Sequence, residues 1–418
     1  MKLNKPGQLL LVSLAGLFAA AFLAACQITT IDYVFVASSA GSGSSGNGVI
    51  DVFAADSQSG ALRPVQGSVA TGGSQPVSMA VTKNYQNLYL ANQASNNIVH
   101  FAVDTNGTLS KKDVINLGSE GTVPVALAVN TAGDHLYVAL ARHPGTGGQV
   151  TGAVLAAFPL SSSGAIGTAE SNGSLDYWPL VVPGFESDLI VPTGVVVTQN
   201  DGGVFVTAYD QSAYNPGGAT TSTANPGWVF GFATGSGINT ASGSPFKAGV
   251  KPTSAAADPT NRFVYVTDFA SNELIGFSIQ AGYSLNFLVN GPFKTGNEPQ
   301  SVAIDPRGKY IYVANALDSS VSAYAIDLAT GTPSSAVNPT GSATNNTDTQ
   351  PVFVLVDPAL GRFVYTANKL GNSVSGFRLD PNTGTLAATQ GTPYPTGFAP
   401  AALASVPHGQ HSSQTPAQ

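Results

Sequence analysis

Apolar and polar positions alternate along most of this chain in short runs, which Gly, Pro and Asn residues separate. Residues 299–333 show the pattern most clearly. A proline-led apolar run and an Asp-Pro turn are followed there by two further apolar runs, at 311–315 and 321–327. β-Branched and aromatic residues at every second position are typical of short antiparallel strands. No part of this stretch has the i, i+3, i+4 spacing of an amphipathic helix. The segment therefore predicts three consecutive strands.

The same pattern recurs at a regular interval. Tyr312 follows Pro299 after thirteen residues, and other proline–aromatic pairs share this spacing to within one residue. These pairs are Pro76 and Tyr89, Pro124 and Tyr137, Pro192 and Phe205, Pro252 and Tyr265, and Pro351 and Tyr365. The proline-led runs recur every ~54 residues, which is enough for four short strands with their loops. The interval predicts a radial array of blades rather than one continuous sandwich.

The two ends of the repeat region complement each other. Residues 33–38 form an aromatic-type strand with no proline-led strand before it, and residues 400–406 form a proline-led strand with no aromatic-type strand after it. We therefore predict an all-β fold, a seven-bladed β-propeller of four-stranded antiparallel blades. The C-terminal strand would join the N-terminal blade and leave no exposed sheet edge at the seam. The propeller would span residues 33–407, and residues 408–418 would be a disordered tail.

The N-terminus has the pattern of an export signal. Lys2 and Lys5 precede an apolar run at 9–23, which ends in Leu-Ala-Ala-Cys at 23–26. This motif matches a bacterial lipoprotein box, so we predict a signal peptide at 1–25, a lipidated Cys26 and a tether at 26–32. An ordinary signal peptide with an incidental cysteine is the alternative. Gln27, in place of the aspartate that favours inner-membrane retention, indicates the outer membrane, on its periplasmic or surface face.

Composition narrows the range of partners. Once Lys2 and Lys5 are removed, 14 basic residues remain against 23 acidic residues, a net charge of −9. No basic cluster is present, which argues against nucleic acid and against electrostatic docking on anionic lipid. We therefore expect a monomer that touches the membrane only through its lipid anchor. Its partner would be a small molecule or another protein of the cell envelope.

The insertions gather on one face of the predicted ring. If the strands of a blade are A (proline-led), B, C and D, the B–C loops and the D–A connections share a face, and tight turns form the other. Long segments rich in Gly, Ser, Asn and Pro occur on the first face, at 39–48, 142–150, 168–188, 210–227 and 336–350. Such insertions often form a binding surface. The alternative is neutral drift in loops that cost little to lengthen.

The candidate functional residues lie in or next to these insertions. An imidazole, a guanidinium and carboxylates in one pocket could perform acid–base catalysis on an ester, so the candidate catalytic residues are His143, Arg142, Glu186 and Asp210. The candidate ligand-binding residues on the same rim are Tyr214, Trp178, Trp228 and Asp188. The alternative is that these are solvated loop charges and packing aromatics.

No cofactor or metal is expected. The G-x-G-x-x-G pattern at 41–46 leads into another strand, whereas a dinucleotide site needs a helix at that point. The sequence has no clustered Cys and His residues.

The repeat resembles a known family. Residues 299–315, with their Asp-Pro turn and Tyr-Val-Ala-Asn strand, are similar to YVTN-type repeats and to the seven-bladed lactonases, which include 6-phosphogluconolactonase and carboxymuconate cyclase. Residues 377–386 resemble the F-x-x-D-x-x-T-G-x-L ending of that family. The resemblance implies the propeller fold and, as one activity, hydrolysis of a lactone. The family's His-x-His approach to a proline-led strand is absent at 182–188. The first hypothesis is therefore a binding module, and the alternative is a divergent lactonase.

Overall fold

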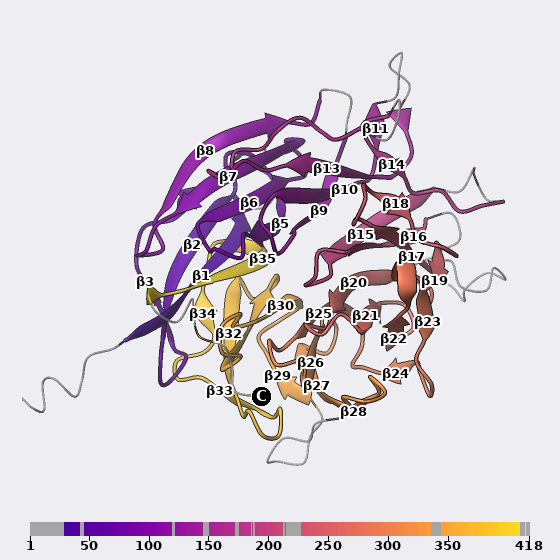
Figure 1. The fold of residues 1–418 in the computed structure, drawn as a ribbon. Coiled ribbons are helices and arrows are strands. Elements are labelled where there is room, and N and C mark those ends of the chain that lie inside the picture. Colours follow the sequence, from indigo (N-terminus) through magenta and orange to yellow (C-terminus); the bar gives the residue numbers. More distant parts are fainter. Residues whose placement is uncertain are drawn as a thin grey trace, which may run out of the picture.

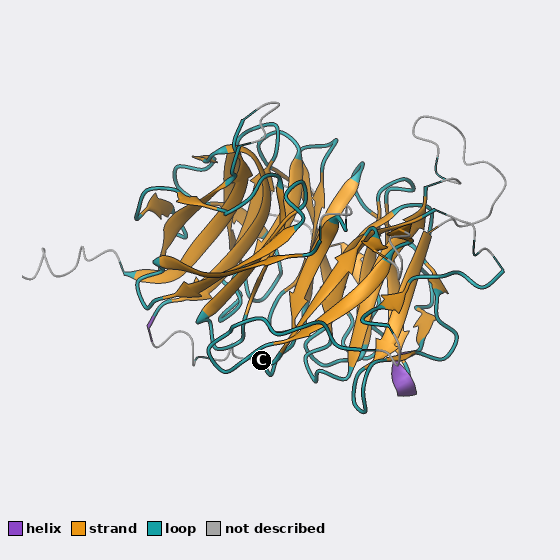
Figure 2. Ribbon diagram, turned by 90° about the horizontal axis from the view of Figure 1, so that it is seen from above, coloured by secondary structure: helices purple, strands orange, loops and turns teal. Residues whose placement is uncertain are grey.

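Seven antiparallel sheets stand around a central axis in the computed structural model (Figure 1). The structure describes residues 29–41, 46–118, 122–144, 150–171, 175–184, 186, 189–211, 214, 227–335, 344–409 and 414. Strands make up nearly all of its regular structure, and the short 3₁₀ turn η1 (Ala281–Tyr283) is the one helical element that spans more than a single described residue (Figure 2). No helix within the same ranges is long and apolar enough to cross a membrane. The predicted all-β propeller is confirmed.

Each blade has the predicted A–B–C–D order from the axis outward. The innermost A strands are β35 (Phe398–Pro407), β5 (Pro76–Val81), β9 (Pro124–Val129), β15 (Ile190–Val197), β20 (Pro252–Ala257), β25 (Pro299–Ile304) and β30 (Pro351–Val356). The B strands are β1 (Thr30–Ser39), β6 (Asn87–Asn92), β10 (His135–Leu140), β16 (Gly203–Asp210), β21 (Phe263–Asp268), β26 (Tyr310–Asn315) and β31 (Phe363–Asn368). Most B-strand residues are buried from both sides, because each blade packs between two others.

The outer half of each blade is less regular. The C strands are β2 (Val49–Asp56), β7 (Asn97–Val103), β13 (Val154–Pro159), β17 (Gly227–Ala233), β22 (Glu273–Ile279), β27 (Ser320–Ile326) and β32 (Ser373–Leu379). Blades two and three have single D strands, β8 (Leu109–Asn116) and β14 (Trp178–Pro179). In the other five blades the D strand consists of two short pieces on one C strand. The pieces are β3 (Leu62–Pro64) and β4 (Val69–Ala70), β18 (Asn239–Thr240) and β19 (Phe246–Lys247), β23 (Leu285–Phe287) and β24 (Phe293–Lys294), β28 (Pro333–Ser335) and β29 (Thr344–Asn346), and β33 (Leu386–Ala388) and β34 (Tyr394–Pro395).

The two ends of the chain close the ring as predicted. Strand β35 pairs antiparallel with β1 along a register that runs from Asp32 opposite Pro407 to Ser39 opposite Phe398. The backbone N–H of His408 then donates to the carbonyl of Ile31 at 2.7 Å, and its ring lies edge-on to Tyr33. Described contacts thus continue one residue past the predicted end of the propeller. The C-terminal strand becomes the innermost strand of the first blade.

Buried tyrosine hydroxyls link neighbouring blades. The aromatic residue of a B strand donates its hydroxyl to the carbonyl of a glycine in the C–D turn of the next blade. The bonds are Tyr89 to Gly164 at 2.6 Å, Tyr265 to Gly331 at 2.6 Å, Tyr312 to Gly384 at 2.9 Å and Tyr365 to Gly60 at 2.9 Å. The last of these crosses the seam between the seventh and first blades. The repeated aromatic position therefore joins blades as well as filling the core.

Glycines in the D–A crossovers make room for the last residue of the B strand. A Cβ atom at Gly73 would lie 2.7 Å from the side chain of Asn92, and one at Gly296 would lie 2.7 Å from that of Asn315. Gly249 has φ +72°, and a Cβ there would lie 2.1 Å from Asp268. A larger residue at any of these positions would force the crossover backbone or the facing side chain to shift.

Candidate functional site

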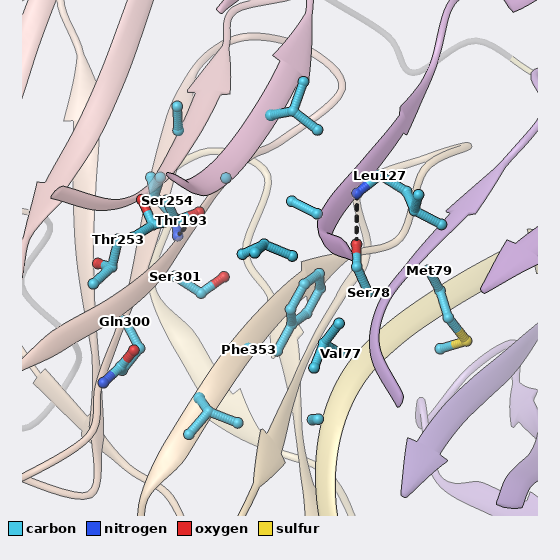
Figure 3. A pocket seen from close by; sticks show the side chains of 18 of the residues that line it. Val77, Ser78, Met79, Leu127, Thr193, Thr253, Ser254, Gln300, Ser301 and Phe353 are labelled. Carbon is cyan, nitrogen blue, oxygen red and sulfur yellow. Dashed lines mark hydrogen bonds between the residues drawn. The ribbon is translucent and has the colours of Figure 1, made fainter. Parts of the chain in front are cut away.

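A channel of about 420 Å³ runs between the seven A strands (Figure 3). Each A strand has a β-bulge directly after its proline, so the residue that follows this proline is left out of the pairing with the B strand. A bulge redirects a side chain. All seven bulged residues line the channel: Val77, Val125, Thr193, Thr253, Gln300, Val352 and Ala401.

The channel is polar on one side. Blades four, five and six contribute Thr193, Thr253 and Gln300, whereas the other four blades contribute small or apolar bulged residues. The two threonine hydroxyls donate to the carbonyls of Pro252 and Pro299 in the next blade, at 2.8 and 2.9 Å. The Gln300 amide has no hydrogen-bond partner among the described residues, so it is available to a molecule in the channel.

Serines that line the channel mostly serve the scaffold. The hydroxyl oxygen of Ser78 accepts the backbone N–H of Leu127 at 3.0 Å (Figure 3), and Ser301 accepts that of Val354 at 3.2 Å. Each bond joins one A strand to the next. These hydroxyls therefore hold the ring together, and none has a histidine beside it that would make it a nucleophile.

The strongest cluster of functional groups surrounds Lys251. This residue directly precedes Pro252, and Gln350, which holds the same position in the seventh blade, lines the channel. The Lys251 Nζ lies 4.4 Å from the ring centroid of Phe269, 4.5 Å from that of Tyr214 and 5.4 Å from that of Tyr209. Aromatic faces attract an ammonium group. Burial lowers the pKa of Lys251, while the carboxylate of Glu298 opposes that shift.

Asp268 holds Lys251 in position. Its carboxylate is fully buried, and its two oxygens accept the backbone N–H groups of Val250 and Lys251, both at 2.8 Å. In three other blades the equivalent residue is an asparagine, which donates its amide instead: Asn92, Asn315 and Asn368. A carboxylate can accept two bonds from the crossover backbone and carries charge. The fifth blade therefore departs from the repeat at the point where its lysine lies.

Glu298 holds the matching position in the sixth blade. It precedes Pro299 and has φ +54°, a conformation that costs free energy in a non-glycine residue. Its N–H donates to the side-chain oxygen of Asn272 at 2.8 Å, and its carbonyl accepts the N–H of Ala316 at 2.9 Å. These two bonds hold the Glu298 backbone two residues before Gln300, which lines the channel, in the blade next to Lys251.

The residues predicted from the insertions do not line the channel. Arg142 is exposed after β10, and His143 begins the short strand β11 (His143–Pro144), which pairs with β12 (Val150–Thr151). Glu186 is fully exposed, and a hydrogen bond from Gly184 in its own turn, 2.9 Å long, lowers its pKa. Asp210 ends β16 as a buried residue. The His143 side chain, together with Asp188 and Cys26, falls outside the described residues, so their predicted roles stay predictions.

The predicted aromatic residues have different surroundings. Trp178 is 5% exposed in the core between blades three and four, and its Nε1 donates to the carbonyl of Ile238 at 2.9 Å. Trp228 packs half-buried against the same cluster. Tyr214 alone among them reaches the Lys251 cluster, where its N–H donates to the carbonyl of Asp210.

The prediction from sequence missed Lys251, Asp268, Glu298, Tyr209 and Phe269. A blade-by-blade comparison of the strand ending VTD with the commoner ending AN could have found the fifth blade.

The described residues contain no group of three or more His, Cys, Asp or Glu side chains that could hold a metal ion. Near the channel mouth, the described side chains include an ammonium group, a carboxylate, tyrosine hydroxyls and amides.

Comparison with known proteins finds a protein family that matches most of the sequence. The family described as "Lactonase, 7-bladed beta-propeller" matches residues 13–125 and 234–411. The unmatched segment between them contains three of the predicted insertions. No curated protein matches the sequence.

Solved structures share the fold. A putative 6-phosphogluconolactonase from Bacteroides uniformis has a TM-score of 0.68 at 16% identity and covers 90% of this chain and 100% of its own. The periplasmic gluconolactonase PpgL of Pseudomonas aeruginosa has a TM-score of 0.67 at 18% identity, with 91% and 100% covered.

Proposed function

The chain belongs to the seven-bladed β-propeller lactonase family, and from this premise we propose that it hydrolyses the lactone ring of a small, neutral, polyhydroxylated molecule at the channel mouth. One observation carries the proposal. An ammonium group and a carboxylate, those of Lys251 and Glu298, occupy matching positions in adjacent blades beside the polar side of the channel. Two solved structures of this fold are described as a gluconolactonase and a putative 6-phosphogluconolactonase.

Hydrolysis needs a base and a stabilised oxyanion. A water oxygen bonds to the lactone carbonyl carbon and the water loses a proton. The bond from that carbon to the ring oxygen breaks, and the ring oxygen takes up the proton that the water lost. The Glu298 carboxylate would accept the proton from water, and the Lys251 ammonium would stabilise the negative charge on the carbonyl oxygen. Partial burial of Lys251 among aromatic rings strengthens that electrostatic effect because less water competes for the charge than at an exposed site.

The lining favours a neutral substrate with hydroxyl groups. Gln300 and Gln350 offer amide donors and acceptors inside the channel, and hydroxyl-bearing ligands pair well with such groups. Lys369 is the one charged residue in the channel lining, and Glu298 offsets the charge of Lys251. A phosphorylated lactone would bring two negative charges to a mouth with little surplus positive charge. We therefore favour a sugar lactone without a phosphate.

The test is hydrolysis of D-glucono-δ-lactone. The reaction is monitored through the acid that it releases in weak buffer, and the rate of spontaneous hydrolysis is subtracted. Glu298→Gln should lower kcat/KM about 10²–10⁴-fold, the usual contribution of a positioned acid or base. Lys251→Met should lower kcat/KM by about 10²–10³-fold, because it removes an oxyanion donor. Gln75→Ala is the matched control: Gln75 precedes Pro76 with φ +57°, as Glu298 precedes Pro299 with φ +54°, but it carries no charge and belongs to the second blade.

Further measurements distinguish the proposed site from the rim predicted from sequence and from a binding module without activity. The 6-phosphate of the same lactone should turn over more slowly, and Arg142→Ala and His143→Ala test the rim predicted from sequence. Wild-type turnover equal to the spontaneous rate would overturn the proposal, and saturable binding without turnover would favour the binding module instead. If turnover persists in Glu298→Gln but is lost in His143→Ala, the catalytic site would lie in the insertion at 142–150 instead.

A further inference from the structure

A second cavity, of about 720 Å³, lies between blades six and seven on the face opposite the channel mouth. It is bounded by the A–B turns of these two blades, by the end of β32 and by the C–D turn that follows. This face carries the tight turns, and none of the functional residues predicted from sequence lies on it. The cavity volume falls within the range that accommodates a small organic ligand.

Three of the six arginines in the chain line this one cavity. Arg307 is almost fully buried: its Nε donates to the buried carboxylate of Asp305 at 2.5 Å, and a terminal nitrogen donates to the carbonyl of Gly361 at 3.2 Å. Arg362 and Arg378 are exposed instead. Asp305 therefore offsets Arg307, whereas the other two guanidinium groups have no ion-pair partner among the described residues. A guanidinium without such a partner is available to an incoming anion.

The rest of the lining is amphipathic. Asp380 is the one carboxylate among the lining residues, and its Oδ1 accepts the backbone N–H of Asn382 at 2.8 Å. The Arg362 and Arg378 side chains thus exceed it by one positive charge. Leu360, Leu379, Leu386, Pro381 and Ala387 supply an apolar wall. The cavity can therefore take an anionic head and an apolar body together.

From these observations we propose that the cavity binds a small organic phosphomonoester, its phosphate held by Arg362 and Arg378 and its organic part against the leucines. A phosphate offers several oxygens in the geometry that guanidinium groups pair with. The site is independent of the proposed lactonase activity, because it lies on the other face and shares no residue with the channel mouth. On this proposal the channel, which carries little charge, would bind neutral ligands, and the arginine-lined cavity on the opposite face would bind phosphorylated ligands.

The experiment measures binding of phenyl phosphate to the purified full chain by calorimetry at constant ionic strength. We expect saturable binding to one site. Arg362→Met and Arg378→Met should each weaken binding about tenfold or more, the loss typical of one charge-assisted hydrogen-bonding partner. Arg307 is left intact, since its removal would strand the buried Asp305 carboxylate.

Arg262→Met is the matched control. Arg262 occupies the same turn position in the fifth blade and lies over Phe263, as Arg362 lies over Phe363, yet it does not line this cavity. Its loss should leave the affinity unchanged. Unaltered melting of each variant without ligand confirms the fold.

Three results would overturn the proposal. They are no saturable binding in the wild type, equal affinity in the Arg362→Met/Arg378→Met double variant, or an equal loss in Arg262→Met. Two more probes test the ligand class. Benzoate should bind at least tenfold more weakly than phenyl phosphate if the head group is a phosphate, and inorganic phosphate should also bind more weakly if the apolar wall is used. Equal affinity for either probe would contradict the phosphomonoester assignment.

Discussion

The Tyr365 hydroxyl bonds across the seam of the ring, and replacing Tyr365 by phenylalanine would remove that bond alone. Its acceptor, the Gly60 carbonyl, is buried and 2.9 Å away, and Tyr365 itself is 1% exposed. Phenylalanine keeps the ring and its packing against the core of the first and seventh blades. The variant therefore tests whether the repeated tyrosine contributes to stability through its hydroxyl.

The magnitude follows from the burial of both partners. A neutral hydrogen bond contributes a net ~0.5–1.5 kcal/mol, and a buried acceptor left without a donor costs ~1–3 kcal/mol. Tyr365→Phe should therefore lower the free energy of unfolding by about 1–3 kcal/mol. With an m-value of about 3 kcal/mol/M for a large chain, the midpoint of urea unfolding should fall by about 0.3–1 M.

The assay is urea unfolding followed by fluorescence of Trp178 and Trp228, which lie in blades three and four, away from the seam. Tyr312→Phe, at an interior blade boundary, should cost about the same as Tyr365→Phe. Tyr137→Phe is the control, because the described residues include no acceptor of this kind for its hydroxyl. An unchanged midpoint in Tyr365→Phe, or an equal drop in Tyr137→Phe, would refute the reasoning.

Three further predictions concern the seam and the anchor. Deletion of residues 399–418 removes β35 and should cause cooperative loss of stability in thermal melts, whereas deletion of 410–418 should leave the melting curve unchanged. Burial, together with the carboxylate of Asp357, raises the pKa of Asp32, whose two oxygens have no hydrogen-bond partner among the described residues. The contribution of that carboxyl to stability should therefore be fully present below its unfolded-state pKa and should be lost as pH rises through its raised folded-state value. Asp32→Asn should flatten this dependence in melts at pH 5 and pH 8, and an unchanged slope would contradict it. We also propose the lipid anchor: Cys26→Ser should release the protein from the membrane fraction or leave it unprocessed, and unchanged association would count against it.

The architecture could be predicted from sequence because it depends on local patterns that recur. The proline-led strand and the aromatic strand repeat along the chain, so each blade supports the assignment of the others. The half-blades at 33–38 and 400–406 required closure, since an open ring would leave sheet edges unpaired.

The candidate site was harder to predict, because it depends on contacts between blades. The insertions drew attention to the outer rim, whereas the Lys251 cluster lies at the start of an A strand, two residues before Thr253, which lines the channel. Nothing near Lys251 in the sequence indicates that Tyr214, from the fourth blade, lies against its ammonium group. Trp178 was expected on the rim, but its large apolar ring packs in the core instead.

In a repeat protein, departures from the repeat are more informative than the repeat itself. Asn92, Asn315 and Asn368 show what the end of a B strand requires for stability alone, so Asp268 at the same position calls for another explanation. Its carboxylate fixes the backbone of Lys251, another departure, since the equivalent residues in the second and seventh blades are glutamines. Because the scaffold tolerates neutral residues at both positions, stability does not require this pair of charges. The charges are best explained by a ligand or a reaction at the channel mouth. The lactone assay tests this explanation directly.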